Sequence, residues 1–215
     1  MRDFVLLDYP KARQLLDQYH VKTVDAAVAH GEKDAVELAR KLGYPVALKV
    51  LSPEIVHKTD IGALRLNLKN DGQVHRAYRA ILKAAGKARV TGVLVQKMAK
   101  PGLELIVGGK RDPQFGPIVL FGLGGILVEA MGDFSVRVCP VHRDQAHEML
   151  GEIKAARILE GVRGKPPVDK AAIAHLITEV SRMMEERPRI RELDLNPVIA
   201  YHEGYVIVDA RIMVD

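Results

Sequence analysis

The spacing of hydrophobic residues along the chain predicts helices and strands in a mixed order. Apolar stripes that recur every three to four residues predict helices at residues 9–19, 33–42, 74–85, 144–159 and 169–186. Short apolar runs and strict alternation predict strands at residues 46–51, 63–69, 90–98, 103–107, 118–121, 126–129, 134–141, 190–200 and 205–214. These elements together predict an α/β protein with two lobes that meet near residues 96–102.

The last two predicted strands carry polar residues in an arrangement that suits a metal ion. On the first strand, alternation groups Glu192, Asp194 and Asn196 on one face. On the second strand, it groups Tyr205, Ile207, Asp209 and Arg211. A hairpin with an even-numbered loop pairs even with odd positions here, so Asn196 falls opposite or diagonal to Asp209. An amide oxygen and a carboxylate are ligands that Mg²⁺ accepts. Exposed ion pairs with Arg191 and Arg211 are the competing interpretation.

A lysine, Lys49, interrupts the apolar run of residues 46–51. Burial of an ammonium group is costly unless the group meets an anion or reaches solvent. A nucleotide phosphate would be such an anion, so Lys49 is a candidate phosphate-binding residue. The simpler interpretation is that its side chain extends from the strand end into water.

The polar segment between the strands at 46–51 and 63–69 contains His57, Lys58 and Asp60. A histidine nitrogen can accept a phosphoryl group near neutral pH. Lys58 would then offset the phosphate charge and Asp60 would orient the ring. A surface histidine with no such role is the alternative.

The segment Gln96, Lys97 and Met98 lies where the two predicted lobes meet, and Glu104 follows it. Its backbone groups suit a nucleotide base, and the carboxylate of Glu104 suits a ribose. An ordinary linker explains the segment equally well.

Three glycines, at positions 122, 124 and 125, follow the predicted strand at 118–121. Glycines let backbone N–H groups approach an anion closely. Their spacing matches no known phosphate-binding motif, so a plain turn between strands is the safer interpretation.

Composition limits the possible classes of function. The 215 residues carry a formal charge of +5, which suggests an anionic partner. Aromatic residues make up 5%, tryptophan is absent and the basic residues form no long run, so we do not expect nucleic-acid binding. No apolar stretch approaches the ~20 residues of a membrane helix. With one cysteine, Cys139, and no signal-like segment, we expect a cytoplasmic protein that binds no membrane.

Longer strings of the sequence resemble the β subunit of ADP-forming acyl-CoA synthetases, relatives of succinyl-CoA synthetase in the ATP-grasp superfamily. The strings are YPVALKVLSPEIVHKTDIGAL, VLVQKM, PGLELIVGGKRDPQFGPIVLFGLGGILVE and RELDLNPVIA. The resemblance implies an ATP-grasp fold, in which a nucleotide cleft separates two α/β lobes. It implies an N-terminal helix in residues 1–20 that packs on the C-terminal lobe, a lid lobe at 21–96, and a C-terminal lobe at 97–215 with the Mg-nucleotide site.

The resemblance also implies a reaction. Members of this family reversibly convert acyl-CoA, ADP and phosphate into the free acid, CoA and ATP, and phosphohistidine carries the phosphoryl group to ADP. It assigns the carrier role to His57, nucleotide contacts to Lys49, Gln96, Lys97, Met98 and Glu104, and magnesium binding to Asn196 and Asp209. It implies Mg²⁺ and ATP or ADP as cofactors. It also implies a separate CoA-binding α subunit and an α₂β₂ heterotetramer.

Two other functions are weighed against this one. A stand-alone ATP-grasp carboxylate ligase would consume ATP by forming an acyl phosphate on this chain, without a partner subunit. A basic nucleic-acid-binding module would show an affinity that depends steeply on salt.

Overall fold

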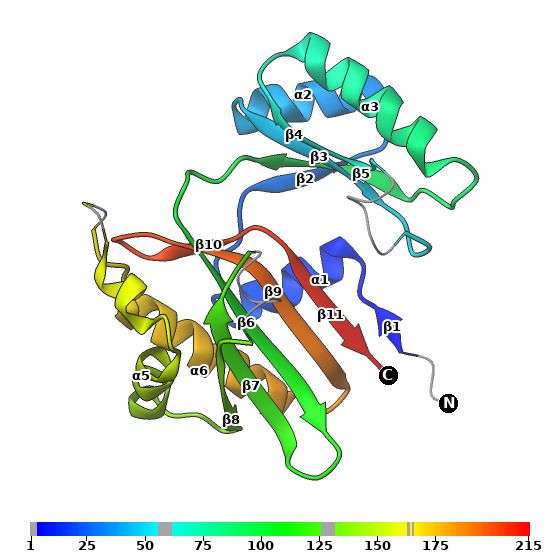
Figure 1. The fold of residues 1–215 in the computed structure, drawn as a ribbon. Coiled ribbons are helices and arrows are strands. Elements are labelled where there is room, and N and C mark those ends of the chain that lie inside the picture. Colours follow the sequence, from blue (N-terminus) through cyan, green and yellow to red (C-terminus); the bar gives the residue numbers. More distant parts are fainter. Residues whose placement is uncertain (1–3, 56–61, 126–131, 163, 165) are drawn as a thin grey trace. The chain divides into compact units, whose positions relative to one another are not determined.

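The computed structural model describes residues 4–55, 62–125, 132–162, 164 and 166–215. The chain forms two compact units (Figure 1). Unit 1 comprises Met1–Thr23 and Pro101–Asp215, and unit 2 comprises Val24–Lys100. The divisions expected after residues 20 and 96 thus lie a few residues before those of the structure. No helix in the described ranges is long and apolar enough to cross a membrane.

Unit 2 is a four-stranded antiparallel sheet, sheet B, with two helices on one face (Figure 1). The strand order is β2 (Ala26–Ala29), β5 (Gly92–Lys97), β3 (Val46–Leu51) and β4 (Leu64–Leu68). The helices are α2 (Glu32–Leu42) and α3 (Asp71–Ala85). Their apolar stripes pack on alternate residues of β3 and β5, with Val46, Leu48, Val50, Val93 and Val95 fully buried. Sheet B therefore has one face covered by helices and one that carries none among the residues the structure describes.

Local signals explain where these two helices begin and end. Helix α3 starts after Asn70, whose side chain accepts a hydrogen bond from the Gln73 amide. Helix α2 ends at Gly43, whose φ of 82° is readily adopted only by glycine. The predictions for both helices and for the strand at 46–51 are therefore confirmed.

Strand β4 departs from the predicted alternation. The pairing of β3 with β4 shifts between Val46 and Leu48, and Asn67 adopts a φ of 57°. Because of this bulge, Leu68 packs in the core opposite Val46, whereas Leu64 lies opposite Lys49 and Leu66 is 56% exposed. The predicted strand is present, but strict alternation, which would place the three leucines on one face, fails at the bulge.

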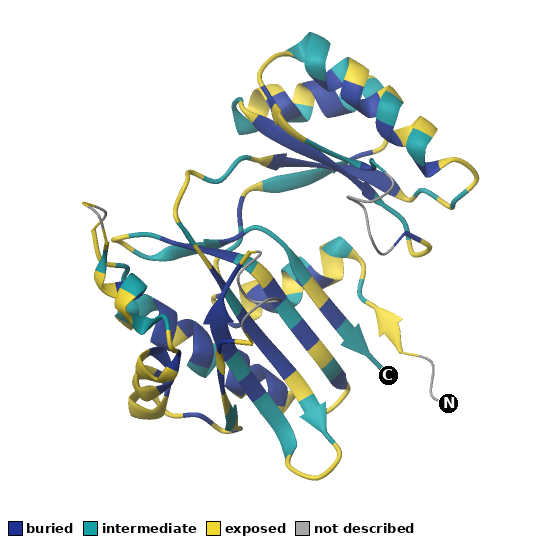
Figure 2. Ribbon diagram, in the orientation of Figure 1, coloured by how far each residue is buried: buried dark blue, intermediate teal, exposed yellow. Residues whose placement is uncertain are grey.

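Unit 1 contains a seven-stranded sheet, sheet A, and the larger core. Its path runs β1 (Val5–Leu6), β11 (Ala210–Val214), β9 (Ile190–Ala200), β6 (Leu103–Asp112), β7 (Gly116–Leu123) and β8 (Phe134–Val138), and β10 (Tyr205–Ile207) pairs with β9. Helices α1 (Tyr9–Gln18), α5 (Arg143–Glu152) and α6 (Lys170–Glu186) and the 3₁₀ helix η1 (Ala156–Glu160) lie on one side of it (Figure 1). Figure 2 shows the alternation of buried and exposed residues along its strands. One face of sheet A thus forms the core, and the other carries no described helix.

Two predicted elements of unit 1 are interrupted in the structure. The helix expected at 144–159 ends at Glu152, because the buried carboxylate of Asp133 accepts hydrogen bonds from the amides of Lys154 and Ala155 and holds the chain in a turn. The strand expected at 205–214 is two strands, β10 and β11, separated at Val208 and Asp209. The strand expected at 126–129 lies outside the described residues.

Candidate functional site

Strands β3 and β5 bring Lys49 and Gln96 together on sheet B. Lys49 lies opposite Leu94, and Gln96 lies opposite Ala47, two residues from Lys49 along β3. The two side chains are therefore diagonal neighbours on the face without helices. Lys49 is 6% exposed and Gln96 is 3% exposed. Such burial argues against a lysine that extends into water, because a buried ammonium group must lie near polar or charged groups.

Two backbone N–H groups of the Gln96–Met98 segment donate hydrogen bonds within unit 2. The Lys97 amide donates a hydrogen bond to the Asp25 carbonyl (2.9 Å), and the Met98 amide donates to the Pro45 carbonyl (3.1 Å). The side chain of Lys97 is exposed and that of Met98 is half-buried. A base bound here would therefore contact side chains or carbonyl groups and not these two N–H donors.

The glycine segment after β7 packs directly on Glu104 of β6. The Gly124 amide donates to the Glu104 carbonyl (2.7 Å), and a Cβ at Gly124 would lie 2.9 Å from the carbonyl carbon of Glu104. A Cβ at Gly125 would lie 3.1 Å from a carboxylate oxygen of Glu104. Close backbone approach requires glycine at position 124, and a φ of 73° favours glycine at position 125. The glycines thereby hold Glu104, the predicted ribose ligand, in its position on β6. Their spacing in the sequence gave no sign of this structural role.

Asn196 of β9 and Asp209 lie directly opposite each other. The Asn196 amide donates a hydrogen bond to the Asp209 carbonyl (3.1 Å), and the Val208 amide donates to the Pro197 carbonyl (3.0 Å). The even-loop rule predicted this juxtaposition. The side chain of Asn196 is exposed and that of Asp209 is half-buried, so an amide group and a carboxylate lie at one point of sheet A.

The predicted grouping of residues on the second strand is wrong. Ile207 is 1% exposed and belongs to the core, whereas Arg211 is exposed. On β9, Leu195 and Val198 are both core residues although three positions separate them, and the pairing of β6 with β9 shifts at the same level. Alternation thus changes phase in both strands where Asn196 meets Asp209.

Asp194 is a further acidic residue of this site. It lies opposite Arg211 on β11 and opposite Gly108 on β6. Burial raises the pKa of its carboxyl group, the charges of Asp209 and Glu192 raise it further, and Arg211 opposes the shift. Arg191 does not take part in the expected surface pairing, because its guanidinium binds Asp215 (2.8 Å). The site therefore combines the acidic residues Glu192, Asp194 and Asp209 with two cations, Arg211 on β11 and Lys110, which lies opposite Glu192 on β6.

The raised pKa of Asp194 predicts an effect on stability. Because the folded state disfavours the ionised carboxylate, unfolding becomes easier as pH rises from the ordinary value of 3.8 through the raised pKa. Asp194→Asn should therefore raise the Tm at pH 7 by about 2 °C, the order expected for under 1 kcal/mol in a chain of this size. Thermal scans from pH 3 to pH 8 measure it.

The low-pH end of the same thermal scans serves as a control for Asp194→Asn. The gain in Tm from Asp194→Asn should vanish near pH 3, where the aspartate is protonated in both folded and unfolded chains. Glu192→Gln, at an exposed position of the same strand, should leave the Tm nearly unchanged. A gain that is independent of pH would contradict the electrostatic explanation.

The proposed phosphoryl-transfer residues His57, Lys58 and Asp60 lie outside the described residues. The described residues that follow this segment are hydrogen-bonded to strands of sheet B. The Val50 amide donates to the Ala63 carbonyl (3.1 Å), and the Arg65 guanidinium donates to the Gly62 carbonyl (2.6 Å).

Comparison with known proteins identifies the fold family. Residues 3–214 match the family described as ATP-grasp domain. The chain belongs to the ATP-grasp family. The β subunit of ADP-forming acetate–CoA ligase I from Pyrococcus furiosus is 43% identical over 208 residues, which cover 95% of this chain and 90% of that one.

Two further relatives extend this comparison of the ATP-grasp chain. ADP-forming acetate–CoA ligase I from Archaeoglobus fulgidus is 45% identical over 203 residues, which cover 93% of this chain but 30% of the ligase. The solved structure of acetyl-coenzyme A synthetase 1 from Ca. Korarchaeum cryptofilum, in complex with coenzyme A and Ca-AMPCP, superimposes with a TM-score of 0.95 at 42% identity. It covers 98% of this chain and 94% of that one. The chain therefore matches a whole subunit in some relatives and about a third of a longer chain in others.

Proposed function

We propose that this chain is the nucleotide-binding subunit of an ADP-forming acyl-CoA synthetase. The enzyme reversibly converts acyl-CoA, ADP and phosphate into the free acid, CoA and ATP. The observation that carries the proposal is the burial of Lys49 beside Gln96 on the face of sheet B that has no helices, in a chain 43% identical to a ligase β subunit. A lysine in an apolar strand needs a polar or anionic partner for its ammonium group, and a phosphate can serve as one.

Asn196 and Asp209 fit a magnesium ion by the chemistry of their donors. They offer an amide oxygen and a carboxylate at directly opposed positions, and the charge that raises the pKa of Asp194 favours a cation nearby. A bound Mg²⁺ would neutralise charge on the nucleotide phosphates. Support comes from a Korarchaeum synthetase structure that contains Mg-AMPPCP.

The remaining nucleotide contacts are those that the resemblance to ADP-forming acyl-CoA synthetases implies. Lys49 binds a phosphate, Gln96, Lys97 and Met98 contact the base, and Glu104 accepts hydrogen bonds from the ribose. The backbone contact of Gly124 holds Glu104 in place for that role. Adenine and guanine nucleotides share the phosphates and the ribose, so the choice between ADP and GDP depends on the base contacts.

His57 is proposed as the phosphoryl carrier, with Lys58 and Asp60 beside it in sequence. In the direction of ATP synthesis, the bond between phosphorus and the histidine nitrogen breaks, and a bond forms from phosphorus to a terminal oxygen of ADP. Positioning and charge neutralisation dominate the catalysis of such transfers. A Korarchaeum synthetase structure has a phosphohistidine segment that points towards its nucleotide site.

A CoA-binding α subunit is the proposed partner, in an α₂β₂ assembly in the cytoplasm. The P. furiosus relative is named a subunit, whereas the A. fulgidus relative carries the matching region as 30% of a longer chain. The remaining part of such an enzyme is a separate subunit in some relatives and part of the same chain in others.

Formation of ATP tests the proposal directly. The chain is purified with its CoA-binding subunit and supplied with ADP, phosphate, Mg²⁺ and a panel of acyl-CoA thioesters. We expect ATP formation that requires both subunits. Synthesis of acyl phosphate by this chain alone would instead support a stand-alone carboxylate ligase.

Asp209→Ala should weaken the binding of Mg-ADP by about 10- to 100-fold, because it removes the carboxylate from the proposed metal site. Calorimetric titrations with ADP, with and without Mg²⁺, measure the change. The affinity for ADP without Mg²⁺ should stay the same. Glu203→Ala, which removes an exposed carboxylate from the β9–β10 turn, is the matched control. An unchanged Mg-ADP affinity in Asp209→Ala would exclude Asp209 as a metal ligand.

A further inference from the structure

Asp133 carries a buried carboxylate and lies directly before β8 in unit 1. Its side chain is 6% exposed. The two carboxylate oxygens accept hydrogen bonds from the amides of Lys154 (2.6 Å) and Ala155 (2.9 Å), which follow the end of α5. A buried carboxylate is costly unless it is hydrogen-bonded, and these two bonds give each oxygen a partner. They join the start of β8 to the turn after α5.

The backbone of Asp133 packs against the end of β7. Gly122 lies opposite Phe134 in the pairing of β7 with β8. A Cβ at Gly122 would lie 2.8 Å from the Asp133 carbonyl oxygen, closer than a real Cβ approaches a backbone atom. Position 122 therefore accepts only glycine while that carbonyl stays in place. The fixed carbonyl of Asp133 thus limits where the backbone of Gly122 can lie.

The same end of β7 holds Glu104. Two residues after Gly122, the Gly124 amide donates a hydrogen bond to the Glu104 carbonyl (2.7 Å). Gly122 and Gly124 are both buried, whereas the side chain of Glu104 is exposed and can reach a ligand. A series of buried backbone contacts therefore leads from Asp133 through Gly122 and Gly124 to a side chain at the surface of unit 1.

We propose that Asp133 is a positioning residue for nucleotide binding. Its carboxylate keeps the end of β7 in place, and β7 in turn holds Glu104 where it can accept hydrogen bonds from the ribose. This inference rests on the proposed function, which assigns the ribose to Glu104. Binding groups need supporting contacts that hold them in their productive geometry. The competing explanation is a purely structural role, in which Asp133 only ends α5.

Titrations of the full chain with Mg-ADP test this role. Asp133→Ala should weaken binding by about tenfold, because a misplaced Glu104 loses its hydrogen bonds to the ribose. Asp133→Asn, which keeps one acceptor oxygen, should restore part of that loss. Dideoxy-ADP, in which the ribose lacks both hydroxyl groups, should bind equally well to the wild-type chain and to Asp133→Ala. In the assay of ATP formation, the KM for ADP should rise while kcat stays nearly the same, because the ribose is remote from the transferred phosphorus.

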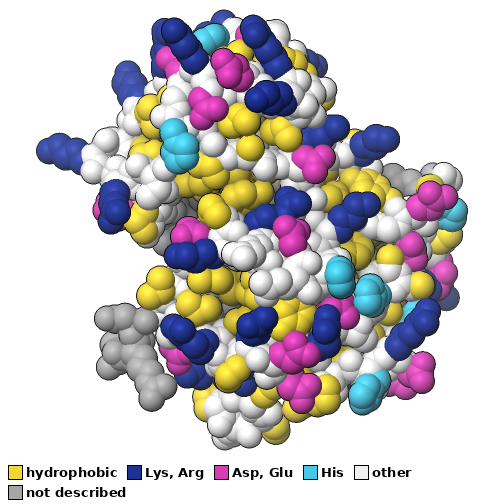
Figure 3. Space-filling view, turned by 180° about the vertical axis from the view of Figure 1, so that it is seen from behind, with side chains coloured by type: hydrophobic (Ala, Val, Ile, Leu, Met, Phe, Trp, Pro, Cys, Tyr) yellow, Lys and Arg dark blue, Asp and Glu magenta, His cyan; other side chains and the backbone are white. Residues whose placement is uncertain are grey.

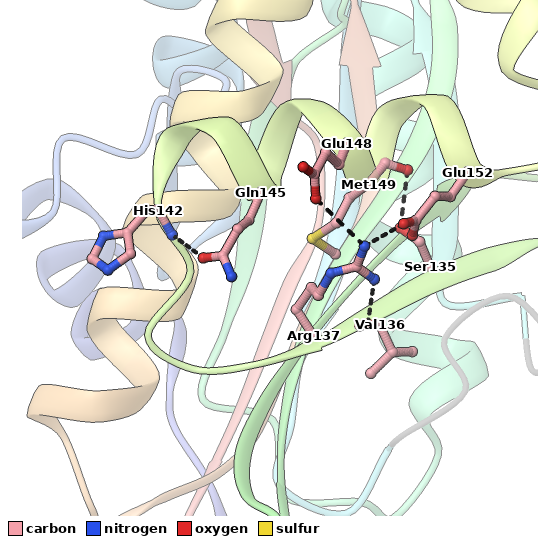
Figure 4. A network of polar contacts seen from close by, with 8 residues as sticks. All are labelled: Ser135, Val136, Arg137, His142, Gln145, Glu148, Met149 and Glu152. Carbon is pink, nitrogen blue, oxygen red and sulfur yellow. Dashed lines mark hydrogen bonds and ion pairs between the residues drawn. The ribbon is translucent and has the colours of Figure 1, made fainter.

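Ser135→Ala is the matched control. Ser135 is also 6% exposed, and its hydroxyl group donates a hydrogen bond to the Met149 carbonyl of α5 (3.0 Å; Figure 4). The substitution therefore removes a buried contact between β8 and α5, at a position that pairs with Phe121 and not with Gly122. It should lower the Tm, as Asp133→Ala should, but leave the affinity for Mg-ADP unchanged. If both variants weaken binding alike, the structural explanation holds and the inference is overturned.

Glu104→Ala separates this inference from the proposed function. This substitution should itself weaken the binding of Mg-ADP by about tenfold or more. Adding Asp133→Ala to it should cause no further loss, because both changes act through one contact. If Glu104→Ala binds Mg-ADP as the wild-type chain does, the proposed ribose contact fails and the inference fails with it. If Glu104→Ala weakens binding but Asp133→Ala does not, or if the two effects add, only the inference is overturned. Should Asp133→Ala not fold, Asp133→Asn takes its place in the same comparison.

Discussion

His57→Ala should carry no phosphoryl label after incubation with Mg²⁺ and ATP labelled at the γ-phosphate, whereas the wild-type chain should become labelled. Transfer breaks the bond between the γ-phosphorus and the bridging oxygen, releases ADP and forms a bond from phosphorus to the histidine nitrogen, which loses its proton. A phosphoramidate of this kind is lost in acid and kept in base. Counting the protein-bound label after each treatment measures the effect.

His75→Ala is the control for this experiment. The His75 ring nitrogen Nδ1 lies 2.7 Å from the Glu32 carboxylate, a contact that joins α2 and α3 within unit 2. This histidine has a structural partner, so its removal should leave the label in place. Label retained by His57→Ala would remove His57 from the reaction.

Strands buried on a regular pattern could be predicted from the sequence. Strand β3 has the predicted bounds Val46–Leu51, and β9 has the predicted bounds Ile190–Ala200. Each follows a hydrophobic pattern and is bounded by turn residues. The helix stripes succeed for the same reason, because periodic burial is the dominant local signal.

Elements that depend on their neighbours could not be predicted. Strand β2 consists of three alanines and a valine, a composition that does not favour a strand on its own, and it forms by pairing with β5. The break between β10 and β11 lies at Val208 and Asp209, where one polar residue follows an apolar run, a pattern that an unbroken strand also shows. The bulge that exposes Leu66 likewise arises from register with β3.

Some features of the candidate site could likewise be predicted from the sequence, and others could not. The prediction that Asn196 falls opposite or diagonal to Asp209 followed from pairing parity, which requires a hairpin with an even-numbered loop, and the loop between Ala200 and Tyr205 meets this condition. The environment of Asp194 requires knowledge of which strand lies on each side of β9. The approach of Gly124 to Glu104 joins residues of two strands, and no spacing rule encodes it.

The positive charge of the chain belongs to unit 2. Val24–Lys100 contains 14 Lys and Arg against 7 Asp and Glu, a formal charge of +7, whereas unit 1 contains 18 against 20, a formal charge of −2. Figure 3 shows Lys and Arg side chains over the part of unit 2 that carries its helices. This division suits a unit that attracts nucleotide phosphates and another that holds a cation through carboxylates.

Lys49→Met should lower kcat/KM for ATP formation by about 100- to 1000-fold, the range seen when one preorganised group that stabilises developing charge is removed. Methionine keeps much of the length and the apolar stem of lysine, so the packing of β3 should survive while the ammonium group is lost. Because Lys49 is 6% exposed, water cannot restore the missing charge at that position. Initial rates with varied ADP separate the loss in kcat from any rise in KM.

Lys83→Met is the matched control for Lys49→Met. Lys83 is an exposed residue of α3 in the same unit, so its substitution removes the same charge from unit 2 without touching the face that carries Lys49 and Gln96. If the net charge of unit 2 governed nucleotide binding, both variants would lose activity alike. A local role for Lys49 requires that the rate falls in Lys49→Met alone, and an unchanged rate in that variant would exclude the lysine from phosphate binding.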